Sequence, residues 1–192
     1  MAERIPIVRL SSLLLPTTDV GVQVCDEHDR AVVAHALGNG HTFGVVMNDN
    51  IVGTVARISG YAMLPDGRYL LELEGTSRFE ISTLHENGEY TKAKVRHMPE
   101  PIGNFGKARA ASQEVSRLFH LYRARCGDGD LPVHLPVDPV TRSYTVASRL
   151  GVDDNEKQRL LELEGADERL VAEREILVRE ITVLDHLQSK RG

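Results

Sequence analysis

Residues 51–81 hold three short runs in which apolar and polar side chains follow a strand-like pattern. The run 51–58 is almost continuously apolar, and the runs 68–74 and 77–81 alternate apolar with charged residues. A period of two with β-branched and aromatic residues is typical of paired strands. Pro65-Asp66-Gly67 predicts a turn, because proline presets φ, aspartate bonds its own backbone and glycine accepts a positive φ. This stretch therefore predicts three successive strands.

Further strand patterns flank this stretch, together with one helical pattern. Strands are expected at residues 5–10, 20–24, 42–47 and 90–96. Between them, residues 26–38 have helical spacing, with Asp26 as the expected N-cap. Many short strands at regular intervals favour closure into a barrel, which removes unpaired edges. Residues 1–98 are therefore predicted to form an antiparallel β-barrel with one short helix.

The pattern changes after residues 98–103, which carry two prolines and a glycine. Beyond this linker the apolar period becomes 3.6, as in amphipathic helices. Helices are expected at 108–125, at 139–150 with Asp138 as N-cap, after a cap at Asp154 or Asn155, and at 167–187. The predicted fold is α+β, with a helical bundle over residues 104–190 following the barrel.

Composition limits the cellular setting and the partners. The 192 residues carry a net charge of −5, which argues against a general nucleic-acid binder. No apolar run approaches the ~20 residues that cross a bilayer, and no signal peptide is evident. Two distant cysteines make no disulfide framework. We therefore expect a soluble, cytoplasmic protein with neither a membrane nor a nucleic-acid partner.

Cys25 is the residue that most invites a catalytic hypothesis. It lies at the start of the predicted helix, where the helix dipole stabilises a thiolate, and is followed by Asp26, Glu27 and His28. Flanking carboxylates oppose that effect, and no base in reach can be identified. A small buried residue at a strand end is the favoured interpretation. A small hydrolase or thiol enzyme using the Cys25 region is the alternative.

The histidines show no spacing typical of metal ligands. His28 and His35 are two helical turns apart, or ~10 Å, too far to share a metal as residues i and i+4 do. No metal, cofactor or catalytic residue is therefore predicted.

Residues 60–64, Gly-Tyr-Ala-Met-Leu, are interpreted as a loop between strands. Exposed apolar residues in loops often mark a contact surface, whereas the same residues can fold over a barrel end and complete its core. Tyr61, Met63 and Leu64 are the candidate peptide-contact residues, either for a partner or for self-association.

Several short motifs follow one another in a set order along the chain. The first are Ile5-Pro6-Ile7 and Leu13-Leu14-Leu15-Pro16. The later ones are Phe43-Gly44-Val45-Val46, Ile51–Ala56, Pro65–Tyr69, Gly75–Phe79, Ala147–Leu150, Glu156–Glu162 and Glu168-Arg169-Leu170. In this order they resemble the N-terminal domain of the Lon ATP-dependent proteases, although residues 21–30 keep little of that family's pattern.

The resemblance implies a non-catalytic module that binds protein or peptide, with a PUA-like barrel. In Lon proteases separate domains hydrolyse ATP and peptides, and this sequence has no Gly-x-x-x-x-Gly-Lys-Ser/Thr phosphate loop. Because PUA-like folds include RNA binders, the basic strip Lys92, Lys94 and Arg96 is a candidate nucleic-acid site. Three charges without interleaved aromatic residues are more typical of a solvated strand face.

Overall fold

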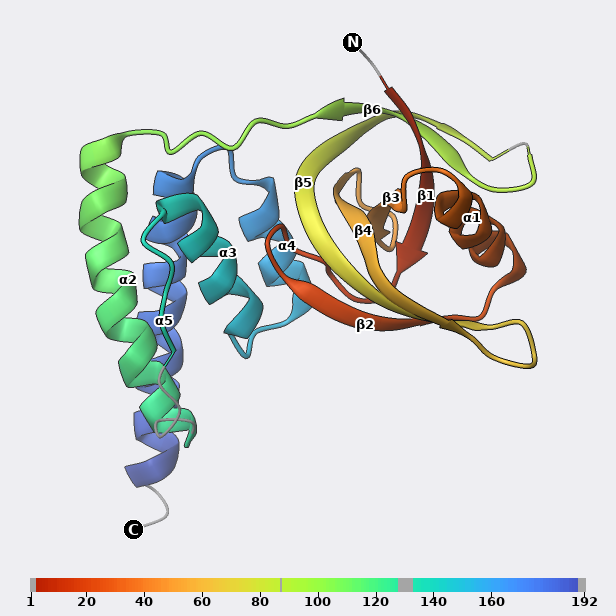
Figure 1. The fold of residues 1–192 in the computed structure, drawn as a ribbon. Helices are drawn as coiled ribbons and strands as arrows, with labels where there is room; N and C mark the ends of the chain where they lie inside the picture. The colour runs from red at the N-terminus through yellow and green to blue at the C-terminus, as the bar shows by residue number, and fades with distance from the viewer. Residues whose placement is uncertain (1–2, 87, 128–132, 190–192) are drawn as a thin grey trace. The chain divides into compact units, whose positions relative to one another are not determined.

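The structure, a computed structural model, describes residues 3–86, 88–127 and 133–189 (Figure 1). Its contacts cluster into two compact units, Met1–Pro99 and Glu100–Gly192, called here the β unit and the helical unit. The strands and one short helix belong to the β unit, and the remaining helices belong to the helical unit. The α+β class predicted from the sequence is confirmed.

The β unit contains six strands and one helix in the described residues. Their bounds are β1 (Glu3–Leu10), β2 (Asp19–Val24), α1 (Glu27–Gly38), β3 (Thr42–Met47), β4 (Val52–Met63), β5 (Tyr69–His85) and β6 (Lys92–His97). Asp26 caps α1 as predicted, because its Oδ1 accepts hydrogen bonds from the backbone N–H groups of His28 and Asp29.

The six strands form one sheet whose pairings close on themselves (Figure 1). β1 pairs with β3 and β6, β4 joins β3 to β5, and β5 returns to β6. β2 joins this ring through β5. β1 and β3 are parallel, so the expectation of an entirely antiparallel barrel is wrong at this pair and the sheet is mixed. The connection through β2 and α1 is long enough for the crossover that parallel strands need.

β5 is one continuous strand of 17 residues, where the sequence pattern predicted two strands at 68–74 and 77–81. Gly75, between those two runs, stays within the strand because its backbone N–H donates to Thr18 and its carbonyl accepts from Thr17. A Cβ added at Gly75 would collide with the carbonyl oxygen of Leu15. The register against β4 shifts between Thr54 and Ala56, so the irregularity is a bulge within one strand.

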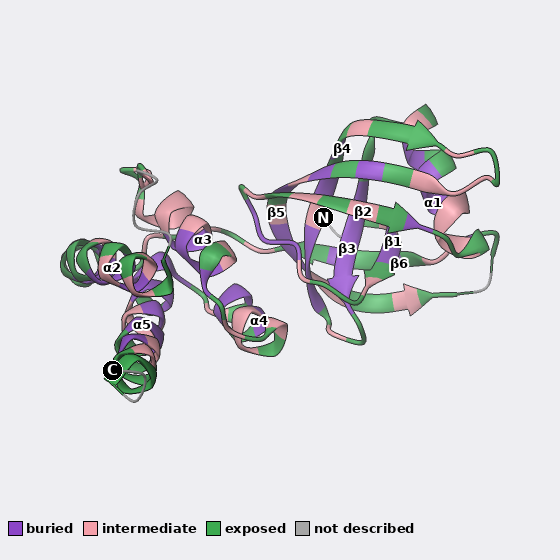
Figure 2. Cartoon of the chain, turned by 90° about the horizontal axis from the view of Figure 1, so that it is seen from below, coloured by how far each residue is buried: buried purple, intermediate pink, exposed green. Residues whose placement is uncertain are grey.

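The ring and α1 enclose the larger apolar core of the β unit. Figure 2 shows buried residues along the strands and on one side of α1. Val32 and Val33 of α1 are fully buried in the same cluster as Leu71 and Leu73 of β5. α1 packs against β1 and β3, so the helix closes the core where these strands face it.

Arg78 and Phe79 are structural residues of β5. Both are fully buried, and Phe79 belongs to a second apolar cluster with residues of β1, β3 and β6. The Arg78 guanidinium donates from Nη2 to the carbonyl oxygen of Pro99 at 2.8 Å. Met98 in turn donates its N–H to the Arg78 carbonyl oxygen, so β5 fixes the segment that follows β6.

The helical unit contains α2 (Phe105–Cys126), α3 (Pro139–Arg149), α4 (Asp154–Glu162) and α5 (Ala166–Ser189). α2 packs along α5, and α3 also contacts α5 (Figure 2). Asp138 caps α3 as predicted, whereas α4 is capped by Asp153, one residue before the earlier of the two expected caps. Within the described residues, no helix is long and apolar enough to cross a membrane.

Charged side chains are buried in the helical unit. Arg169 is fully buried, and its Nε donates to Ser143 Oγ at 2.8 Å while Nη2 donates to Glu100 Oε2 at 3.3 Å. Glu173, four residues along α5, is also fully buried, although a carboxyl group on a helix is normally solvated. Burial raises the pKa of Glu173 well above its ordinary value, and nearby Arg169 only partly opposes this.

Candidate protein-binding surface

Two of the three candidate contact residues lie in a strand rather than in a loop. Tyr61 and Met63 belong to the last residues of β4 and pair with Leu71 and Tyr69 of β5. The sequence interpretation was wrong here because the turn begins only at Leu64, where Pro65, Asp66 and Gly67 reverse the chain. Leu64 itself closes that turn by donating its N–H to Arg68 and accepting from Gly67.

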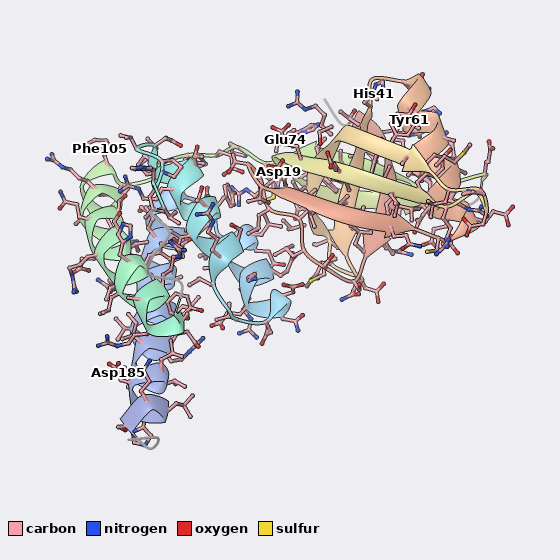
Figure 3. All side chains as sticks on the ribbon, turned by 60° about the horizontal axis from the view of Figure 1, so that its bottom comes forward. Asp19, His41, Tyr61, Glu74, Phe105 and Asp185 are labelled. Atoms are coloured by element: carbon pink, nitrogen blue, oxygen red, sulfur yellow. The ribbon has the colours of Figure 1, made fainter. Side chains whose placement is uncertain are left out.

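Two of the three candidates present apolar surface to solvent. The exposed fractions are 57% for Tyr61 and 66% for Met63. Leu64 is half-buried and presents less surface to solvent. Tyr61 and Met63 are two residues apart in a strand and therefore point to the same face. Figure 3 shows Tyr61 at the surface of the β unit. The structure thus places an exposed aromatic and an exposed thioether side by side.

The turn that follows these residues is held by a local ion pair. Arg68 donates from its backbone N–H and from Nε to the carboxylate of Asp66, the latter at 2.8 Å. These hydrogen bonds lower the pKa of Asp66, with the side-chain bond from Arg68 as the largest cause. Gly67 has a φ of +84°, which favours glycine, and its Cα faces the Arg30 guanidinium of α1. The hairpin tip is therefore held by its own hydrogen bonds and lies next to Arg30 of α1.

Cys25 differs from its favoured sequence interpretation, because its side chain is exposed rather than buried. The Arg68 guanidinium lies near the thiol: Asp66 is the main cause of the raised pKa of Arg68, and Cys25 adds a smaller contribution. A guanidinium stays protonated at all ordinary pH values and cannot act as a general base. The neighbour of the thiol therefore does not supply the base that a thiol enzyme requires.

The basic strip of β6 is partly neutralised. Arg96 forms an ion pair with Glu80 of β5, and Lys92 Nζ lies 4.6 Å from the centre of the Tyr90 ring. Among the described residues, no group of three or more His, Cys, Asp and Glu side chains is arranged to hold a metal ion.

A second exposed apolar pair lies in the helical unit and was not singled out from the sequence. Phe105 at the start of α2 and Val137 before α3 have exposed fractions of 65% and 90%. They line a depression together with Arg109 and Arg142 (Phe105 is labelled in Figure 3). Both residues lie at helix starts, where periodicity predicts neither burial nor exposure, so the sequence held no signal for them.

A closed sheet ring with one short helix, followed by a helical unit, defines the α+β class of this chain. Residues 4–179 match the family described as the ATP-dependent protease La (LON) substrate-binding domain. The chain belongs to this family, as its sequence motifs indicated.

The curated relatives are much longer than this chain. It is 28% identical over 149 residues to the Lon protease of Escherichia coli, an alignment that covers 75% of the chain and 19% of that protein. It is 30% identical over 150 residues to Lon protease 2 of Bdellovibrio bacteriovorus, covering 74% and 19%. The chain thus matches about a fifth of each relative.

Two solved structures share the fold. The N-terminal domain of the Mycobacterium avium complex Lon protease superposes with a TM-score of 0.76 at 18% identity, covering 92% of this chain and 98% of that one. The Lon N-terminal domain protein from Xanthomonas campestris gives 0.63 at 22% identity, covering 88% and 95%.

Proposed function

We propose that this chain is a non-catalytic module that binds extended or unfolded segments of other proteins. The observation that carries the proposal is the match of residues 4–179 to a substrate-binding domain family. The aligned relatives are ATP-dependent proteases, of which the chain corresponds to about 19%. The proposed role is therefore recognition of a protein substrate or partner, without a reaction on it.

Tyr61 and Met63 are proposed as contact residues of this module. An amphipathic tyrosine and a flexible thioether suit a surface that accepts many sequences. Their backbone is held by pairing with β5, so a partner orders little more than the two side chains. Leu64 contributes mainly to the turn, where its backbone makes both hydrogen bonds.

The test is binding to an unfolded protein, for which reduced and carboxymethylated α-lactalbumin is a suitable probe, with the native protein as the folded comparison. The variant Tyr61→Ser/Met63→Ser should weaken binding about tenfold or more, because each apolar side chain contributes about 1.5–3 kcal/mol when fully buried. Isothermal calorimetry or fluorescence anisotropy measures the change.

Val178→Ser/Val183→Ser is the matched control, because it removes two comparably exposed apolar side chains from α5. Equal affinity of both double variants and the wild type would refute the assignment of these residues. A wild-type chain that binds neither form of the probe would refute the proposed function. Concentration-dependent dimerisation lost in Tyr61→Ser/Met63→Ser would instead identify the surface as a self-association site.

We also infer a cytoplasmic setting for the module. Cys25 and Cys126 are both exposed and unpaired, and free exposed thiols are suited to a reducing compartment.

A further inference from the structure

β2 has one edge without a strand partner. Among the described residues it pairs with β5 alone, over Asp19–Val24 against Tyr69–Glu74. Figure 1 shows β2 running beside β5. An unpaired strand edge presents a row of N–H and C=O groups that can template another strand, and most proteins cover or shorten such edges.

Hydrogen-bonded and non-hydrogen-bonded pairs alternate along the ladder of β2 and β5. This alternation identifies the β2 residues whose backbone N–H and C=O groups point to the free edge. The N–H of Gly75 donates to the carbonyl of Thr18 at 2.8 Å, so this opposed pair is hydrogen-bonded. In an antiparallel ladder every second pair is of this kind. The backbone groups of Val20, Val22 and Val24 are therefore turned to β5, and those of Asp19, Gly21 and Gln23 are turned to the free edge.

The two faces of β2 differ in chemistry. Val22 lies opposite Leu71, which lies opposite Tyr61, so an apolar row on the core face of the sheet crosses three strands and ends at the β2 edge; Leu71 within this row is fully buried. On the other face Asp19 lies opposite Glu74, and both are labelled in Figure 3. Glu74 is paired with Arg57.

The acidic face retains negative charge next to the free edge. A depression on this face is lined by Asp19, Gly21, Ser59 and Glu72. Within the described part of the chain, neither Asp19 nor Glu72 forms an ion pair. Basic side chains on an added strand would therefore meet unneutralised carboxylates.

We propose that β2 captures an extended segment of a partner protein as an added antiparallel strand. The segment alternates apolar and basic residues: apolar side chains continue the row of Tyr61, Leu71 and Val22, and basic side chains face Asp19. This mode rests on the proposed binding function and names how that binding occurs. The backbone supplies affinity that tolerates many sequences, and the two faces supply preference.

Gly21→Pro tests the edge within the protein. Proline removes the Gly21 N–H from the free edge but keeps the ladder with β5, and it is tolerated at edge strands whose N–H faces solvent. Gly21 has no positive φ and open space around its Cα, so its backbone can accept a side chain. Gly21→Ala is the matched control, because it adds a Cβ and retains the N–H. Thermal unfolding reports whether both variants are folded.

A peptide pair tests the same hydrogen bonds from the partner side. The probe is a peptide of alternating valine and lysine, as long as β2. In antiparallel pairing the lysines lie opposite Asp19, Gly21 and Gln23. The backbone N–H groups of these lysines then donate hydrogen bonds to β2. Backbone N-methylation of the lysines should abolish binding, and N-methylation of the valines should leave it. Fluorescence anisotropy of labelled peptides gives the affinities.

We expect Gly21→Pro to bind the unmodified peptide about fivefold more weakly than Gly21→Ala, or worse, since one net hydrogen bond is lost. Equal affinity of the two variants, or of the two N-methylated peptides, overturns the proposal. If Gly21→Pro does not fold, the two N-methylated peptides decide the question.

The two proposals can also be told apart. If Tyr61→Ser/Met63→Ser no longer binds the unfolded probe while Gly21→Pro still binds it, the binding function stands and strand addition is refuted. A wild-type chain that dimerises through this edge, with Gly21→Pro monomeric, overturns the assignment of a partner segment. A wild-type chain that binds no probe overturns both proposals.

Discussion

Replacing Arg169 with alanine should destabilise the helical unit by about 3 kcal/mol. Removing one partner of a buried ion pair costs about 3–5 kcal/mol, and the lower end of that range is expected here. The guanidinium is fully buried and lies 4.1 Å from the centre of the Tyr144 ring. Its Nη1 also donates to the carbonyl oxygens of Leu160 and Leu163, each at 3.4 Å. Truncation removes the donor to these acceptors and leaves empty volume. The lower end applies because its carboxylate partner, Glu100, is 25% exposed and can be resolvated.

Urea unfolding followed by far-UV circular dichroism measures this loss, because the helices dominate the signal. Arg174→Ala is the matched control: it lies on the same helix, and its ion pair with Glu114 at 3.3 Å joins side chains that are 39% and 54% exposed. Such exposed pairs contribute about 0–1 kcal/mol. A loss for Arg169→Ala no larger than that for Arg174→Ala would refute the argument that the buried guanidinium stabilises this unit.

Two further changes test the buried interior. Burial raises the pKa of Glu173 well above its ordinary value of 4.5, so the folded chain retains a proton that the unfolded chain releases. The free energy of unfolding should therefore fall as pH rises from 4.5 through the pKa of the folded state. Glu173→Gln should reduce that slope and be more stable than the wild type above that range; urea midpoints across pH check this, and an unchanged slope contradicts it. Gly75→Ala should cost about 1–3 kcal/mol, because the added Cβ collides with the Leu15 carbonyl oxygen, whereas Gly21→Ala meets open space and should change stability little. Equal melting temperatures for these two variants would show that the chain near Leu15 moves aside at little cost.

The elements of this fold could be predicted because local chemistry specifies them. Asp26 and Asp138 cap helices as their sequence context indicated, and residues 65–67 form the expected turn. The pairing of strands could not be predicted in the same way. The parallel contact of β1 and β3 depends on how residues 11–41 cross the sheet, and no local pattern records that path.

The errors at Gly75 and at residues 60–64 have one cause. Glycine and a break in alternation indicate a turn when read along the chain, but here both lie inside long paired strands. At Gly75 the approach of the Leu15 backbone requires the missing Cβ, which is a tertiary constraint. Burial of Glu173 likewise has no local signal in the sequence, because a carboxyl group on a helix is normally solvated.

The two proposed contact elements are connected through the N-terminal half of β5. Tyr69–Glu74 pairs with β2 on one side and with the Tyr61–Met63 end of β4 on the other. Adjacent strands are about 4.8 Å apart, so the β2 edge and Tyr61 are about 10 Å apart on the same face. A segment added to β2 lies one strand spacing further out, about 14 Å from Tyr61, and the buried side chain of Leu71 lies between them. Tyr61→Ser and Gly21→Pro therefore act at separated sites, and their effects on the affinity for a bound segment should add within about 0.5 kcal/mol when combined.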